Sequence, residues 1–176
     1  EDNEPGELPI ETSIKTGFHV GPILEFRIKS NLSFKTGIIY SSQGYKYNAH
    51  DSYEEINGEI TLNYLQVPLT ATLAYQSGDN KFYGILGSYL SYGLTGKEKW
   101  GLDGHHYEYN IEWGKDEDYA RLDYGLDFGA GIEIKSIQIE FRYKLGLRDI
   151  QPPSNDGWSS KNRVIGISIS YFLVSK

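Results

Sequence analysis

Ionisable side chains recur at alternate positions in two neighbouring stretches, 121–133 and 138–148, where a strand would point them all to one face. Together with two charges near the N-terminus, the set is Glu25, Lys35, Arg121, Asp123, Asp127, Glu133, Glu140, Arg142, Lys144 and Arg148. Such a row could line a path for ions, or its members could form ion pairs with one another that fill and block the interior as a plug. The interior of a small barrel is only wide enough for side chains, so the plug is the favoured interpretation.

His19 and Ser41 fall on the same face when the first two predicted strands are paired. A histidine beside a serine suggests a base and a nucleophile, and hence a membrane-embedded hydrolase or acyltransferase that His19→Ala would inactivate. No carboxylate that would orient the histidine can be identified in the sequence, and polar interiors commonly contain both residue types. We therefore expect no catalytic residues and no enzymatic activity.

The segment around residues 96–118 combines histidines, acids and aromatic residues. His105 and His106, with Asp103 and Glu108, could bind a metal, but adjacent histidines on a strand point to opposite sides, and zinc-type spacing is absent. We expect no metal and no cofactor. The predicted contact surface for a protein or a glycan consists of Trp100, His105, His106, Trp113 and Trp158. The alternative is that the tryptophans anchor the belts and pack the loops.

The elements that hold these residues are strands with one apolar and one polar face. Even positions are apolar from Ala120 to Ile134, and odd positions are apolar from Ile137 to Leu147. A hairpin centred on Lys135 and Ser136 pairs residues whose numbers sum to 271, which keeps both faces continuous. The polar face then sets Asp127 opposite Lys144 and Asp123 opposite Arg148, with Gly129 facing Arg142 and Gly131 facing Glu140.

Four further stretches alternate in the same way, 18–28, 32–40, 65–75 and 165–171, and a fifth, 82–94, shows a blurred alternation. With the central hairpin they make seven strands. The turn at 29–31 offers Asn31 for a left-handed position and pairs Glu25 with Lys35 and Phe26 with Phe34. Pro68 counts against regular pairing at its position. Residues 44–58, 96–118 and 149–162 are expected to be long loops, and residues 1–15 an exposed arm.

Aromatic residues sort to the two ends of the strands. The turn end has Phe26, Phe34, Tyr75, Phe82 and Tyr171, and the loop end has Phe18, Tyr40, Tyr64, Tyr92 and Tyr124. Two such belts are typical of a membrane-spanning barrel.

Composition bounds the function classes. The chain has 176 residues and a net charge of -7, without a basic stripe, so nucleic acid is not an expected partner. No run of about eighteen apolar residues could form a transmembrane helix. The chain contains no methionine, from which we infer that a signal peptide was removed or the chain was trimmed. It contains no cysteine either, which fits a compartment where free thiols are a liability.

The predicted fold is an all-β, antiparallel, up-and-down transmembrane barrel of eight strands, with residues 16–176 as the barrel domain. A long hairpin that is apolar on one face and charge-paired on the other suits a closed barrel in lipid. Bacterial barrels have an even number of strands, so the eighth is expected to precede residue 1, or less favourably to come from residues 7–15.

Several segments resemble the PorT-like outer-membrane β-barrel family that is abundant in Bacteroidetes. They are Tyr64 to Leu69 (YLQVPL), Tyr83 to Tyr92 (YGILGSYLSY), Gly125 to Glu133 (GLDFGAGIE) and the aliphatic-aromatic ending. The resemblance covers most of the chain from Thr16 onward. It implies an eight-stranded outer-membrane barrel reached through a signal peptide, and some members belong to secretion or gliding machinery.

The predicted function is therefore a non-enzymatic outer-membrane barrel with a plugged lumen. Its expected partners are outer-membrane lipid and other outer-membrane or periplasmic subunits of a secretion, transport or surface complex. The alternative is a soluble lipocalin-like barrel, with the apolar face turned inward around a small hydrophobic ligand. Alternation alone does not say which face is inside.

Overall fold

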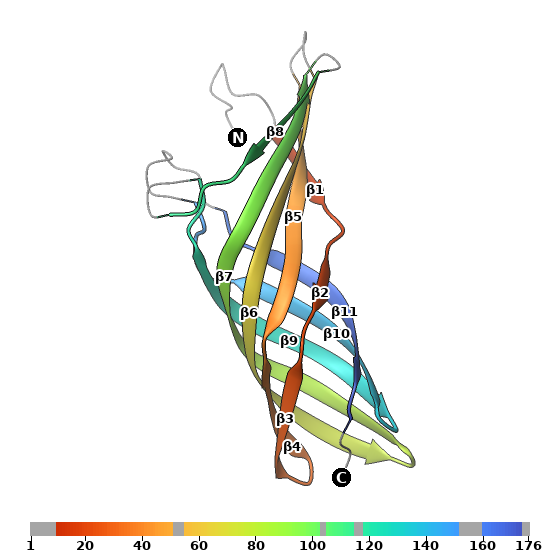
Figure 1. The fold of residues 1–176 in the computed structure, drawn as a ribbon. Coiled ribbons are helices and arrows are strands. Elements are labelled where there is room, and N and C mark those ends of the chain that lie inside the picture. The colour runs from red at the N-terminus through yellow and green to blue at the C-terminus, as the bar shows by residue number, and fades with distance from the viewer. Residues whose placement is uncertain (1–9, 51–54, 103–104, 115–117, 152–159, 174–176) are drawn as a thin grey trace, which may run out of the picture.

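The computed structural model describes residues 10–50, 55–102, 105–114, 118–151 and 160–173. They form one antiparallel sheet that curls until its first and last strands approach each other (Figure 1). The strands are β1 (Ile10–Ile14), β2 (Phe18–Val20), β3 (Ile23–Lys29), β4 (Leu32–Gly37), β5 (Ile39–His50), β6 (Glu55–Ser77), β7 (Asn80–Leu102), β8 (His105–Asn110), β9 (Leu122–Ile134), β10 (Ile137–Gly146) and β11 (Arg163–Tyr171). Among these residues no helix is long and apolar enough to cross a bilayer.

The strands lie in seven rows. The first row contains β1, β2 and β3, the second contains β4 and β5, and β6, β7, β9, β10 and β11 each form one more, while β8 pairs with the upper part of β7. The rows correspond to the seven predicted strands. We call the end with the tight turns at Gly78 and Lys135 the turn end, and the opposite end the loop end.

Pro68 explains one break between the rows. It pairs with Tyr89 of β7 inside a continuous ladder, but its other side faces the gap between β4 and β5. The pairs Thr36–Leu69 and Ile39–Gln66 flank that gap. Because proline has no backbone N–H, it cannot donate to the second row there. The expectation of irregular pairing at Pro68 holds on this side only.

The hairpin of β9 and β10 has the predicted register. Asp127 pairs with Lys144, Gly129 with Arg142 and Ile132 with Ile139. Lys135 in its turn has a φ of 58°, the left-handed conformation that tight hairpin turns require.

The first hairpin also pairs Glu25 with Lys35 and Phe26 with Phe34, as predicted. Its turn was predicted differently: two residues, 30 and 31, connect the strands, and a register shift between Arg27 and Lys29 takes up the odd residue. Asn31 is not left-handed, since Lys135 is the only non-glycine residue with positive φ in the described chain.

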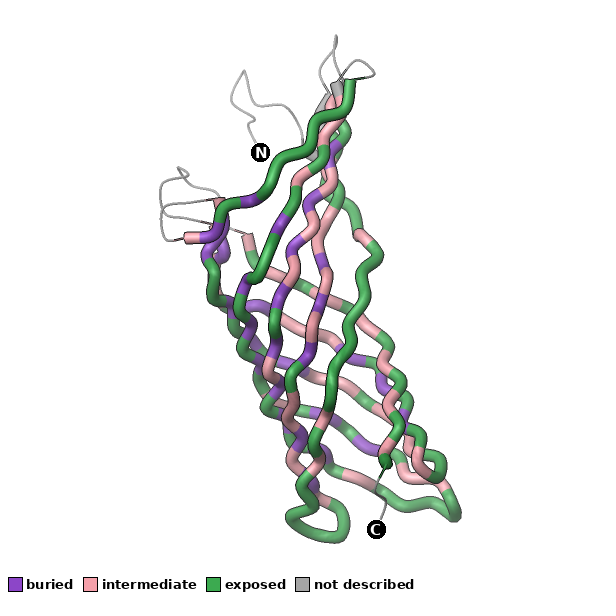
Figure 2. Tube along the Cα trace, viewed as in Figure 1, coloured by how far each residue is buried: buried purple, intermediate pink, exposed green. Residues whose placement is uncertain are grey.

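Between Tyr64 and the turn end the apolar side chains point outward. On β6, Leu65, Leu69 and Leu73 are exposed, whereas Gln66 and Thr70 between them are buried. Figure 2 shows the same alternation of buried and exposed positions along the neighbouring strands. This confirms the predicted orientation and argues against the lipocalin alternative, which needs the apolar face inside.

Between Tyr64 and the loop end the polarity of the two faces is reversed. Ile60 and Leu62 of β6 are buried, while Glu59, Thr61 and Asn63 face outward. The reversal coincides with a register shift between Asn63 and Tyr64 against β7. A sheet that is polar outside is suited to water, so the lipid-facing part of β6 ends near Tyr64.

This reversal overturns two loop predictions. Most of 44–58 and of 96–118 is strand, because β5, β6 and β7 continue past the apolar band and β8 pairs with β7. Residues 10–14, within the predicted arm, form β1 against β5, whereas residues 1–9 lie outside the described residues. The five strands β1, β5, β6, β7 and β8 above Tyr64 are called the loop-side sheet below.

Candidate functional site: a cross-linked interior beneath an aromatic cap

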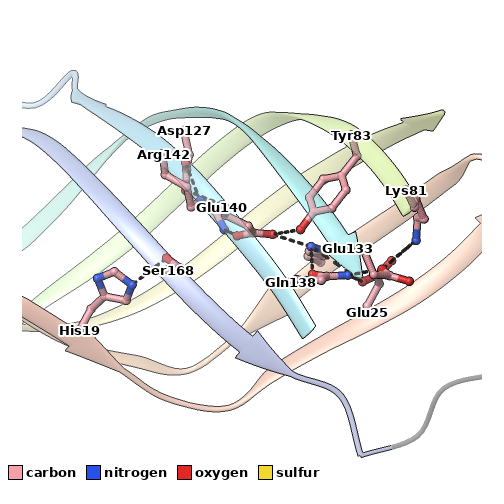
Figure 3. A network of polar contacts seen from close by, with 11 residues as sticks. His19, Glu25, Lys81, Tyr83, Asp127, Glu133, Gln138, Glu140, Arg142 and Ser168 are labelled. Carbon is pink, nitrogen blue, oxygen red and sulfur yellow. Dashed lines mark hydrogen bonds and ion pairs between the residues drawn. The ribbon is translucent and has the colours of Figure 1, made fainter. Parts of the chain in front are cut away.

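Arg142 is the centre of the buried polar interior (Figure 3). Its Nε and Nη2 donate to the two carboxylate oxygens of Asp127 at 3.1 and 2.8 Å, and its Nη1 donates to Glu140 Oε2 at 3.1 Å. Asp127 is 0% exposed. A planar guanidinium fits this bidentate geometry, and Gly129 opposite Arg142 leaves it room.

Glu140 links this pair to the second row. Lys35 Nζ lies 2.6 Å from Glu140 Oε1, and the hydroxyl of Tyr83 donates to the same oxygen at 3.0 Å. The ring of Tyr83 lies over Gly131, where a Cβ would come within 2.6 Å of it. Gly131 thus makes room for Tyr83, its partner in register on β7, and not for Glu140, the neighbour on β10 that the sequence suggested.

The network continues toward the turn end through Gln138. Its amide nitrogen donates to Glu133 at 2.6 Å and to Glu25 at 3.1 Å, and its oxygen accepts from Lys35 at 2.6 Å. Lys81 lies 3.1 Å from Glu133. We call these residues the ionic network: Glu25, Lys35, Lys81, Tyr83, Asp127, Glu133, Gln138, Glu140 and Arg142.

Four charges of the predicted set lie apart from the ionic network. Lys144 donates to Gln66 at 2.6 Å, although it pairs with Asp127 in register. Asp123 accepts from Tyr89 at 3.2 Å and Asn162 at 2.9 Å. Arg121 is exposed and donates to the Trp113 carbonyl at 3.1 Å. Arg148 is half-buried and acts on the Asp123 carboxylate electrostatically.

Sequence reasoning missed five of the polar partners: Gln66, Lys81, Tyr83, Gln138 and Asn162. Four of them are neutral, so a search for charges passes over them. A search for every polar side chain on the inward parity would have found Gln66 and Gln138.

His19 connects the two ends of the sheet. Its Nε2 lies 2.8 Å from Ser168 Oγ on β11, whereas Ser41, its partner in register on β5, lies close to Gln43. A nucleophile and base would need a third group to orient the imidazole. In the described chain no carboxylate hydrogen bonds to His19, so the contact joins the first and last rows without a catalytic arrangement.

A hydrophobic cluster closes the interior above the ionic network. Tyr64 is fully buried and meets the edge of Trp113, with ring centroids 5.4 Å apart. Tyr64 was predicted for the loop-end belt, which is wrong because its even position points inward. The cluster, called the aromatic cap, comprises Ile60, Leu62, Tyr64, Ile111, Trp113, Tyr119 and Ile150.

Residues 111–114 and 118–120 supply three members of the cap, Ile111, Trp113 and Tyr119. Gly114 N donates to the Tyr119 carbonyl at 3.0 Å, which brings Trp113 and Tyr119 together. The Tyr119 hydroxyl lies 3.0 Å from that of Tyr45 on β5. Burial raises the pKa of Tyr119, and the neighbouring Tyr45 raises it further. Both phenols therefore stay neutral at physiological pH and hold the cap to the sheet.

The predicted loop contact residues separate into three environments. Trp113 is buried in the cap, and Trp158 lies outside the described residues. Trp100 stacks on Tyr107 with ring centroids 4.4 Å apart, and the side chains of His105 and His106 are exposed on β8. No group of three or more His, Asp or Glu side chains that could hold a metal occurs in the described part of the chain.

An antiparallel sheet that is apolar outside and ionic inside, with aromatic side chains at both ends of the apolar band, is the arrangement of outer-membrane β-barrel proteins. The family model described as "Outer membrane protein beta-barrel domain" matches residues 3–151, and the chain belongs to that family. It is accordingly a protein of the outer membrane. Neither the curated proteins nor the solved structures contain a match to the chain.

Proposed function

We propose that the protein is a non-enzymatic, non-conducting barrel that anchors its loop-side sheet outside the outer membrane for contact with a partner subunit. The observation that carries this proposal is that the interior is filled at two levels. The ionic network crosses the lower part, with Asp127 and Glu140 bound to Arg142, and the aromatic cap with Tyr64 and Trp113 covers the upper part. Ions would have to break a buried ion pair to pass.

We also propose that an eighth strand closes the sheet into a barrel, because the edges of its first and last rows are unpaired among the described residues. Within the described residues no backbone ladder joins β11 to β2 or β3. Both edges run from the loop end to the turn end, so a strand running upward between them would be antiparallel to both. Unpaired backbone groups in lipid cost several kcal/mol each, which strongly favours such a strand.

The width of the gap suits one strand. Strands in a sheet lie about 4.8 Å apart, so one inserted strand needs ~10 Å between the edges. His19 of β2 and Ser168 of β11 are in contact, with Nε2 and Oγ 2.8 Å apart. Two side chains of this length in contact hold their backbones at most ~10 Å apart, the width that one inserted strand needs. We assign the eighth strand to the part of the natural chain that precedes residue 1. The protein would reach the outer membrane by means of a signal peptide that is then removed.

The PorT-like branch of the family is the finer assignment that we favour. The segments at 64–69, 83–92 and 125–133 support it, and they form the lipid-facing parts of β6, β7 and β9. Membership would place the protein as a subunit of a secretion, transport or surface complex in a member of the Bacteroidetes.

The test is conductance in planar lipid bilayers. The purified protein should insert, as judged by faster migration of the unboiled sample in gels, and should produce no unitary current steps. Regular steps from the inserted wild-type protein would refute the plugged interior. The eighth strand is tested in the natural protein, where the β11 amides should resist hydrogen exchange; rapid exchange at alternate residues of β11 would refute closure.

A further inference from the structure

The outer edge of β8 is an open place for strand pairing. All six residues of β8 are exposed, and β8 pairs with β7 along its other edge. Among the described residues no second strand lies on the free side, because β9 pairs with β7 only from Leu122 onward. An unpaired edge of this length above the lipid is a template for another strand.

The hydrogen-bond pattern identifies which backbone groups are free. Ile111 N donates to the Gly96 carbonyl at 2.9 Å, one position beyond the last pair of the β7–β8 register, Lys97 with Asn110. Hydrogen-bonded pairs alternate along an antiparallel ladder, so residues 105, 107 and 109 bond to β7. The N–H and C=O groups of His106, Glu108 and Asn110 therefore point to the free side.

The side chains around this edge define what could pair with it. On the inner face Trp100 and Tyr107 stack, and Tyr107 remains about half exposed at 47%. On the outer face Glu108 accepts from Lys97 at 2.5 Å and lies 3.2 Å from Lys99, which offsets part of the positive charge of these lysines. Tyr47 and Tyr109 both hydrogen bond to Glu98 and hold the inner face together.

The charge of the loop end favours a basic partner. Residues 40–64 contain four acids and one lysine, and residues 93–121 contain seven acids and four bases. These two segments carry a net charge of -6 out of the -7 of the whole chain. An extended segment with lysine or arginine at alternate positions would meet this field favourably, and an acidic one would be repelled.

A second copy of the chain is a poor occupant for geometric reasons. Antiparallel pairing of β8 with its own copy needs a two-fold axis perpendicular to the sheet, which would turn the second barrel upside down. Two barrels inserted in the same direction could pair only in parallel, through β8 of one and β1 of the other. Parallel pairing is less stable for each residue, and it would form an open chain or a ring.

We propose that the free edge of β8 binds a basic, extended segment of a partner protein as an added antiparallel strand. The backbone groups of His106, Glu108 and Asn110 supply the hydrogen bonds, and the Trp100–Tyr107 pair receives the side chains that face inward. The inference rests on the proposed function, because it requires the loop-side sheet to lie outside the membrane.

The test uses the whole protein in lipid vesicles and a synthetic peptide of about ten residues that alternates lysine and valine, the length of a long strand. A peptide that alternates glutamate and valine is the control for charge. The variant His106→Pro removes one outward N–H without touching the bonds of residues 105 and 107 to β7, and His106→Ala keeps that N–H. Affinity is measured by fluorescence anisotropy, and strand addition by infrared spectra of the peptide with ¹³C-labelled carbonyls.

We expect the lysine peptide to bind, its labelled amide band to move to the β-sheet frequency, and His106→Pro to weaken binding about tenfold while His106→Ala changes it less than about twofold. Equal binding of the glutamate peptide, or equal affinity of His106→Pro, would overturn the proposal. Self-association of the wild-type protein with protected β8 amides, without peptide, would overturn it in favour of a second copy. Migration of unboiled His106→Pro as a folded barrel shows that the variant is intact. A negative binding result then contradicts strand addition at β8 alone and leaves the proposed function standing.

Discussion

Removal of Asp127 tests whether the buried ion pair stabilises the interior. Asp127→Asn keeps the shape of the side chain but removes the charge that accepts two bonds from Arg142 at 3.1 and 2.8 Å. Hydrogen bonds to charged groups contribute about 1.5–3 kcal/mol each, and orphaning one member of a buried pair costs about 3–5 kcal/mol. Because Arg142 keeps its bond to Glu140, we expect the lower end, a loss of about 3 kcal/mol in the free energy of unfolding.

The pairing itself is isolated by a double-mutant cycle. Arg142→Met should cost a similar amount, since it leaves Asp127 buried without its cation. The double variant Asp127→Leu with Arg142→Met, compared with its two single changes, should cost less than their sum by about 2 kcal/mol or more. Unfolding in urea is followed in lipid vesicles by tryptophan fluorescence.

The matched control is an ion pair in water. Glu108→Gln on the loop-side sheet removes an exposed carboxylate from Lys97 and Lys99 and should shift the unfolding midpoint far less than Asp127→Asn does. Additive costs for Asp127 and Arg142, within about 0.5 kcal/mol, would refute the reasoning, because independent sites add to that precision.

Two other predictions concern the loop end. Trp113→Ala should lower the free energy of unfolding by about 3 kcal/mol because it leaves a cavity in the aromatic cap, and Gly93→Ala should also destabilise because its methyl group would overlap the Trp113 ring; unchanged urea midpoints would contradict the packing of the cap. Hydrogen bonds from Lys97 and Lys99 lower the pKa of Glu108, so a carboxyl ¹³C titration should place it below the ordinary range and Lys97→Gln should raise it. The stabilisation from Glu108 is present above the ordinary glutamate pKa of about 4.3 and is lost as pH falls through the lowered pKa, and a normal pKa in the wild type would contradict the contact.

The sequence predicts the lipid-facing half of the fold well because each strand there must satisfy one simple rule. Apolar and polar residues alternate, so a register such as Asp127 opposite Lys144 follows from keeping the faces continuous. The same rule failed above Tyr64, since the faces exchange their chemistry where the strands leave the lipid. Apolar and polar residues alternate there too, but the apolar ones lie inside. The sequence analysis therefore predicts a loop at 44–58, around Tyr47, and assigns no strand to 59–64, which contains Ile60 and Leu62.

The partners within the interior could be predicted only in part. Register fixes which residues lie opposite each other along two neighbouring strands, but a long side chain chooses among diagonal and cross-sheet neighbours. Asp127 thus binds Arg142, which offers two parallel donors, whereas Lys144 reaches Gln66 on β6. Tyr83 lies over Gly131 because β7 pairs directly with β9, and no short hairpin turn joins these two strands to fix their register in the sequence.

The central claim is that the apolar band of the sheet faces lipid and that the outward face of β6 changes from apolar to polar near Tyr64. The chain contains no cysteine, so single cysteines along β6 can carry a spin label without background. Collision with oxygen, which concentrates in lipid, and with a water-soluble nickel complex is measured in vesicles. Labels at Leu69 and Leu73 should favour oxygen, a label at Thr70 should be shielded from both, and a label at Thr61 should favour nickel. Labels at Leu69 and Leu73 that favour nickel, or a label at Thr70 that favours oxygen, would contradict the account.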